Sequence, residues 1–311
     1  MSSIAVASEP RPGRHKALRQ AGHDLLHDRG ALFGLCVIVL LVIAALAGPW
    51  LTPHDPTTVK LSMRLRPPAW LANGQWAYPF GTDHLGRDVL SRIIYGSRVS
   101  LFVGVAVVFF AGIPGTILGT LAGYFGGRTD AFIMRAVDTQ IAFPGLLIAL
   151  LMLTMIGPSV ATLVFVLSFN GWMIYARMAR SVALSARTLP YVEAAELLGC
   201  SRVRVMRLHL FPNLVSPMST LAVLEFARII LAEASLSFLG VGIQPPDASW
   251  GLDITSGRNY VFQAWWLVTF PGVAIAVSVL GANLFASWLK LQTDPNEREK
   301  MFARNAAAKA S

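Results

Sequence analysis

The run ALFGLCVIVLLVIAALAGPW, residues 31–50, contains no charged side chain. A helix needs about 20 apolar residues to cross the hydrocarbon core of a bilayer. The apolar part of a secretory signal is shorter, about 7–15 residues, and lies nearer the start of the chain. We therefore predict that residues 31–50 form a retained membrane-spanning helix and not a cleaved leader.

Five further apolar runs follow along the chain. The sequence predicts an all-α membrane protein with six transmembrane helices, the later five covering residues 99–124, 137–156, 159–178, 214–238 and 265–289. Prolines interrupt several of these runs, among them Pro114, Pro144 and Pro271. Within a bilayer, neighbouring helices and local readjustment satisfy the carbonyl groups that proline frees, so we expect kinked spans.

The composition excludes an ordinary soluble domain. Of the 311 residues, 54% are hydrophobic and only 14% are charged, whereas soluble proteins have about 25% charged residues. The net charge of +9 comes from cations that flank the apolar runs, which is the pattern that sets membrane topology and not a nucleic-acid-binding motif. Cys36 lies in an apolar run and Cys200 in a basic segment, so we predict free thiols.

Lysine and arginine are concentrated in the segments on one side of the predicted helices. Because these residues accumulate in cytoplasmic connections, we predict that both termini lie in the cytoplasm. The polar ends, residues 1–30 and 291–311, are then a cytoplasmic arm and tail, and residues 51–98 form an outer loop. That loop also carries several cations, but long loops cross the membrane with less regard to charge.

The longest inner connection contains YVEAAELLGCSRVRVMRLHLFPN, residues 191–213. Pro190 suits the first turn of a helix, and Glu193 near that end favours the helix dipole. Gly199 can adopt the left-handed conformation that ends a helix, after which Ser201 can cap a second one. We predict two short helices that meet near Gly199, ahead of the fifth span.

The fifth predicted span contains Glu225, Arg228 and Glu233. Charged residues are costly in a bilayer and are functional hypotheses by default. Glu225 and Arg228 can pair on one helix face, and Glu225 lies about 18 Å from the inner end, near the middle of the bilayer. Two interpretations stay open: a pair that lines a polar pathway, or a structural pair whose members satisfy each other.

The second predicted span contains Gly115, Gly119 and Gly123 at four-residue intervals. This spacing lets two helices approach each other closely. A gate or subunit interface and ordinary packing within the chain both fit the pattern, so we regard the three glycines as candidate helix-packing residues.

Residues 80–98 read FGTDHLGRDVLSRIIYGSR. Leu85, Val89, Leu90 and Ile93 recur at helical spacing with charged residues between them. This pattern predicts an amphipathic helix that lies on the membrane or on a partner subunit. Direct contact with a substrate is the alternative interpretation.

Several catalytic patterns are absent from the sequence. It contains no G-x-x-x-x-G-K-[ST] loop that could cradle ATP phosphates, and no H-E-x-x-H motif or nucleophile elbow. An intramembrane enzyme would need a nucleophile beside a base at one depth, which Glu225, Arg228 and Asp138 do not provide. We therefore predict no enzyme activity, no metal and no cofactor in this chain, with energy supplied by a partner.

The inner connection resembles the EAA loop of the membrane subunits of ABC importers. The residues that carry this resemblance are Glu193, Ala194, Ala195, Gly199 and Pro212. The family pattern ends in Ile-x-Leu-Pro, whereas this chain has HLFP at 209–212, so two positions differ. The resemblance implies that residues 190–212 are a coupling helix that docks into a cleft on an ATPase subunit.

Other segments are similar to the "C" subunits of dipeptide and oligopeptide permeases. They are residues 67–70, 80–98, 123–127, 244–251 and 264–272, in order along the chain. The resemblance implies a type I ABC importer permease fold in the bacterial inner membrane. It also implies a permease subunit of an ATP-driven, binding-protein-dependent importer of dipeptides or short peptides.

The same resemblance implies the partners. They are a second membrane subunit, two cytoplasmic ATP-binding subunits that hold the ATP, and an outer substrate-binding protein, with no nucleic acid. In such an importer, Glu225 and Arg228 would contact a zwitterionic peptide during passage. A nickel complex or glutathione is the alternative cargo. A stand-alone secondary carrier is less favoured, because the two halves show no repeat of broken helices.

Overall fold

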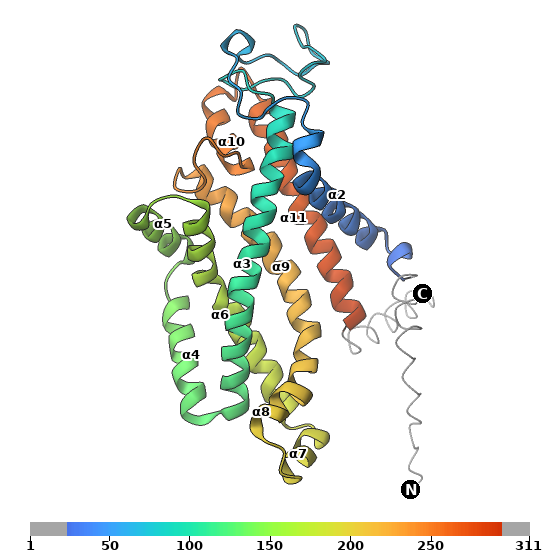
Figure 1. Ribbon diagram of the computed structural model, residues 1–311, viewed down its shortest axis with the longest axis vertical. Helices are drawn as coiled ribbons and strands as arrows, with labels where there is room; N and C mark the ends of the chain where they lie inside the picture. Colours follow the sequence, from blue (N-terminus) through green and yellow to red (C-terminus); the bar gives the residue numbers. More distant parts are fainter. Residues whose placement is uncertain (1–23, 294–311) are drawn as a thin grey trace, which may run out of the picture.

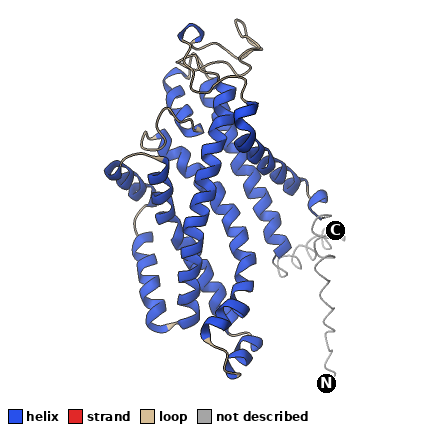
Figure 2. Ribbon diagram, in the orientation of Figure 1, coloured by secondary structure: helices blue, strands red, loops and turns tan. Residues whose placement is uncertain are grey.

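The computed structural model describes residues 24–293. Most of the predicted arm 1–30 and tail 291–311 therefore lies outside the described residues. Within residues 24–293 the chain forms helices and connecting loops and no β-strand, as Figure 2 shows. The prediction of an all-α membrane protein is confirmed.

Five helices in the described part of the chain are long and apolar enough to cross a membrane, and a bent pair of shorter helices makes a sixth if the two count as one span. The five are α2 (Arg29–Leu51), α3 (Val89–Phe125), α6 (Val160–Arg187), α9 (Phe211–Phe238) and α11 (Trp266–Thr293). α3 lies at the centre of the bundle, where it contacts α2, α6 and α9 (Figure 1). Its most extensive partner is α6.

The predicted third span, residues 137–156, is not one straight helix. α4 (Gly127–Ile141) and α5 (Gly145–Ile156) meet at a bend of 82°. Pro144 precedes α5 with extended backbone, and a proline cannot donate the hydrogen bond that would continue α4. α4 also begins earlier than predicted, at Gly127, and two of its charged residues pair with α6. These pairs are Asp130–Arg180 and Asp138–Arg177.

The prediction of an amphipathic helix over 80–98 is wrong in its bounds and in its position. Residues 80–88 form turns, and Val89 begins the same helix that crosses the membrane. Asp88 caps this helix by accepting a hydrogen bond from the Ser91 amide at 3.0 Å. Asp83 accepts from Arg87 Nε at 2.6 Å. Because these charged side chains are buried, the segment packs inside the protein and does not lie on a surface.

Residues 52–88 and 239–265 cover one end of the bundle (top of Figure 1), and we name them the outer cap after the side that the sequence predicts for them. The outer cap contains α10 (Trp250–Gly257) and two single 3-10 turns, η1 (Leu61–Met63) and η3 (Arg258–Tyr260). Arg92 of α3 donates to Asp253 of α10 through Nε at 2.7 Å, and Trp250 Nε1 donates to the Ile93 carbonyl at 2.9 Å. Burial raises the pKa of the Asp253 carboxyl, and the charge of Arg92 opposes this shift.

The opposite end carries α7 (Pro190–Leu197), α8 (Arg202–Val205) and one π-helical turn, η2 (Met206–Leu210) (bottom of Figure 1). The predicted second short helix is not separate, because α8, η2 and α9 run on as one helical stretch, Arg202–Phe238. Pro212 lacks an amide hydrogen, and the π turn before it accommodates this locally. Ser201 stands at the N-cap position of α8 but makes no side-chain cap hydrogen bond.

Candidate coupling loop and membrane polar site

The end of α7 depends on the backbone of Gly199. Pro190 occupies the first turn of the helix, and Glu193 lies in that same turn. Gly199 follows with φ of +79°, a left-handed conformation that glycine adopts at little cost. Among the described residues, no heavy atom lies within 4 Å of where a Cβ on Gly199 would stand. Conformation, and not crowding, therefore favours glycine here.

α7 has one face buried against the bundle and one exposed face. Val192 and Ala195 are buried in a cluster at the inner ends of the membrane helices, whose other members are Tyr124, Ala183, Ala186, Val205 and Leu210. Glu193 and Ala194 are exposed, and so is Pro212 at the start of α9. Of the residues predicted to couple, Ala195 therefore attaches the helix to the bundle, and Glu193 and Ala194 are available to a partner.

The tip of this loop carries exposed apolar side chains that the sequence interpretation missed. Leu197 is 88% exposed, Leu198 is 85% exposed and Val203 is 68% exposed. Side chains of this size that gather around one turn on an exposed loop mark an interaction surface. The paired leucines just before Gly199 are the sequence signal that could have identified it.

Polar contacts connect the loop to the inner end of α3. The Tyr124 hydroxyl donates a hydrogen bond to Glu196 Oε1 at 2.7 Å. Arg187 Nη1 donates to the Tyr124 carbonyl at 3.2 Å, and the Arg202 guanidinium lies 5.8 Å from the centre of the Phe125 ring. These contacts surround a pocket of about 410 Å³. The loop is thus attached to a membrane helix distant from it in sequence.

Glu225 and Arg228 form the ion pair that the sequence predicted. Arg228 donates to Glu225 Oε2 through Nε at 2.8 Å and through Nη2 at 2.6 Å. The Glu225 side chain is 7% exposed, whereas that of Arg228 is 45% exposed. A charge exposed within a membrane span faces the interior of an assembly or a water-filled cavity. Lipid is therefore an unfavourable neighbour for the Arg228 face.

Glu233, on the same helix, has a different environment. It is buried, and it accepts hydrogen bonds from Ser237 Oγ at 2.8 Å and from Ser100 Oγ at 3.3 Å. Ser100 belongs to α3, so the carboxyl group joins two helices of the bundle. We assign Glu233 a structural role.

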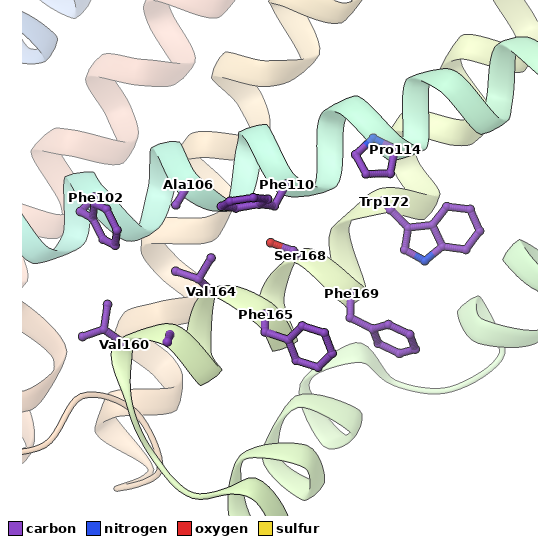
Figure 3. A pocket seen from close by; sticks show the side chains of 11 residues that line it. Phe102, Ala106, Phe110, Pro114, Val160, Val164, Phe165, Ser168, Phe169 and Trp172 are labelled. Atoms are coloured by element: carbon purple, nitrogen blue, oxygen red, sulfur yellow. The ribbon is translucent and has the colours of Figure 1, made fainter.

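α6 presents unpaired polar atoms near this region. Ser168 Oγ, Asn170 Oδ1 and the Tyr175 hydroxyl are buried and have no hydrogen-bond partner among the described residues. Ser168 lines a pocket of about 770 Å³ between α3 and α6, whose other walls are aromatic and aliphatic (Figure 3). Buried polar groups normally have partners, so these three atoms keep the capacity to hydrogen-bond a further group.

The three glycines of α3 lie against α6. A methyl group added at Gly115, Gly119 or Gly123 would come within 2.6 Å of a backbone carbonyl oxygen of α6. Only glycine allows the two backbones to approach this closely. The structure therefore places these glycines at a helix contact within the chain and not at its surface.

Two protein-family models match the chain. Residues 115–298 match the "Binding-protein-dependent transport system inner membrane component" model. Residues 17–68 match the model of the "N-terminal TM domain of oligopeptide transport permease C".

Curated relatives are similar over nearly the whole chain. The di/tripeptide transport system permease protein DppC of Pseudomonas aeruginosa is 38% identical over 94% of this chain and 96% of its own. The dipeptide transport system permease protein DppC of Escherichia coli is 40% identical over 91% of this chain and 94% of its own. Among solved structures, an amino acid ABC transporter aligns with 68% of this chain and 94% of its own, with a TM-score of 0.49 and 17% identity.

Proposed function

Since this chain belongs to the family of binding-protein-dependent transport system inner membrane components, we propose that it is a permease subunit of an importer of dipeptides or short peptides. The similarity to the di/tripeptide and dipeptide permeases, over 91–94% of this chain, carries the proposal. The family consists of transporter subunits and not enzymes, and membership implies ATPase and substrate-binding partners.

The proposed assembly contains a second membrane subunit beside this one, two ATP-binding subunits on the cytoplasmic side and a binding protein on the outer side. We place the chain in the bacterial inner membrane with both termini in the cytoplasm. The end that carries α7 supports this orientation, because cytoplasmic connections collect arginine. Its arginines are Arg180, Arg187, Arg202, Arg204 and Arg207.

The coupling loop docks on the ATPase in this proposal. The exposed apolar tip at Leu197 and Leu198 supports it, since such a surface gains free energy when a partner removes it from water. Glu193 and Ala194 lie on the exposed side of the same helix. When the ATPase subunits close on ATP, the docked loop moves, and the helices attached to it switch the pathway between its two openings.

The pathway passes the face that carries Arg228 in the same proposal. Arg228 stays half-exposed although Glu225 pairs with it, and a guanidinium suits a peptide carboxylate because it can donate two parallel hydrogen bonds. The unpaired atoms of Ser168 and Asn170 on α6 offer further polar contacts along the route.

The test is uptake in bacteria that lack their own dipeptide transporters. Cells that produce this chain with its partner subunits should become sensitive to a toxic dipeptide analogue and accumulate radiolabelled alanylalanine. The Cys36→Ser variant serves as a neutral control, because Cys36 is an exposed thiol on α2. Uptake of a nickel complex or of glutathione without uptake of dipeptides would overturn the proposed cargo.

A further inference from the structure

The covalent link between α6 and the coupling loop is short and non-helical. α6 ends at Arg187 and α7 begins at Pro190, so only Thr188 and Leu189 join them. Two residues outside a helix can absorb a rotation through their backbone dihedrals. If the loop transmits force, as the proposed function requires, a second contact must prevent α7 from turning about this hinge.

Tyr124 provides that contact at the far end of α7. Its hydroxyl donates to Glu196 Oε1 at 2.7 Å, and its ring is buried with Val192 and Ala195. Glu196 lies six residues beyond Pro190, about 9 Å along the helix axis. A contact at this distance from the hinge resists rotation better than one beside it.

Tyr124 is itself firmly held. Arg187 at the end of α6 donates to its carbonyl at 3.2 Å. Gly123, the preceding residue, lies against Arg180 and Ala183 of α6 without room for a methyl group. The inner end of α3 therefore moves with α6.

α3 extends this connection to the other side of the membrane. It has 37 residues and is about 55 Å long. At its outer end, Arg92 bonds Asp253 through Nε at 2.7 Å, and Trp250 donates to the Ile93 carbonyl at 2.9 Å. Both partners belong to α10 of the outer cap, so one continuous helix joins the cap to the loop.

We propose that Tyr124 is a positioning residue that locks the coupling loop to α3, and that α3 passes movement between the loop and the outer cap. The inference rests on the proposed function. Because coupled binding free energies are reciprocal, a binding protein docked on the cap also changes, through the lock, how tightly the ATPase subunits hold ATP.

The test uses the complete transporter in lipid vesicles. Its binding protein is added after purification together with the cargo that the binding protein carries. The readout is the factor by which the binding protein stimulates ATP hydrolysis. Tyr124→Phe removes the hydroxyl and keeps the buried ring. We expect the stimulation factor to fall about fivefold, since this is the change that loss of one hydrogen bond allows in an equilibrium.

Two variants at Glu196 sharpen the test. Glu196→Gln keeps a carbonyl oxygen that can accept from Tyr124, so it should retain most of the stimulation, whereas Glu196→Ala should lose as much as Tyr124→Phe. The double variant Tyr124→Phe/Glu196→Ala should be no worse than either single change, because both remove the same contact. Fully additive losses would overturn the pairing.

Tyr95→Phe is the matched control, because it removes a phenol hydroxyl from the outer part of the same helix. Its stimulation factor should equal that of the wild type. Equal stimulation in Tyr124→Phe and the wild type would overturn the lock. A wild type that the binding protein stimulates but that does not import alanylalanine would instead refute the dipeptide cargo, and the stimulation factors would still test the lock.

Discussion

At the scale of single residues, the φ of +79° at Gly199 requires a residue that tolerates the left-handed conformation, whatever its size. A β-branched side chain in this conformation is strained by about 1–3 kcal/mol, and asparagine tolerates it better. Gly199→Val should therefore lower dipeptide uptake about tenfold at normal membrane abundance. Gly199→Asn should keep most of it. Full uptake by Gly199→Val, normalised to protein amount, would contradict a role for this turn in docking.

The Glu225–Arg228 pair allows its two interpretations to be separated. Removing Arg228 alone leaves the buried charge of Glu225 unpaired, which is destabilising. Glu225→Gln/Arg228→Gln replaces both with side chains that can still hydrogen-bond each other. We expect near-normal abundance and melting temperature, with alanylalanine uptake about tenfold lower because the pathway loses its cation. Unchanged uptake would leave the pair a structural role only.

Sequence reasoning identified some residue contacts and missed others for a physical reason. The pairing of Glu225 with Arg228 follows from helical periodicity. The turn at Gly199 follows from the preference of glycine for the left-handed conformation that ends a helix. The hydrogen bond from Tyr124 to Glu196 joins residues 72 positions apart. No local pattern indicates such a contact, because it depends on how α3 and α6 pack.

At the scale of secondary-structure elements, the close contact between α3 and α6 depends on glycines, which have no side chain to separate the two backbones. Gly119→Ala would place a methyl group against the Ala176 carbonyl, and forcing extra volume into a packed contact costs about 1–3 kcal/mol. We expect a lower melting temperature of the detergent-solubilised protein. Gly272→Ala in α11 is the control, since no described heavy atom lies within 4 Å of its added methyl group. Equal melting of both variants would argue against the close contact.

The elements themselves were partly predictable. Apolar runs located the five long helices that can cross the bilayer, because the bilayer requires long apolar segments. The sixth run falls on the bent pair of α4 and α5. The apolar runs did not reveal the outer turns of α3, which start at Val89 and contain Arg92. Nor did they reveal the 82° bend between α4 and α5. At the starts of α3 and α4, the paired charges of Arg92 and Asp130 extend a helix beyond its apolar part. Hydropathy cannot distinguish a paired charge from a solvated one, and it does not register the backbone that Pro144 sets at the bend.

At the scale of the whole molecule, the exposed leucines at the inner tip predict how the transporter assembles. Leu197→Glu/Leu198→Glu places two charges on the proposed docking surface, so we expect recovery of the ATPase with the affinity-purified permease to fall about tenfold. Leu61→Glu, at a leucine that is 67% exposed in the outer cap, should leave recovery unchanged. Equal recovery in all three proteins would place the ATPase contact elsewhere.

The contacts that close the outer cap also constrain how the protein is made. Arg92 and Asp253 are 161 residues apart, and Trp266 reaches the Thr82 carbonyl across 184 residues. A ribosome delivers the first helices long before these partners emerge. The guanidinium must therefore wait for its carboxylate partner while most of the polypeptide is still being inserted, and a product that stops before residue 253 lacks the ion pair that joins α3 to α10.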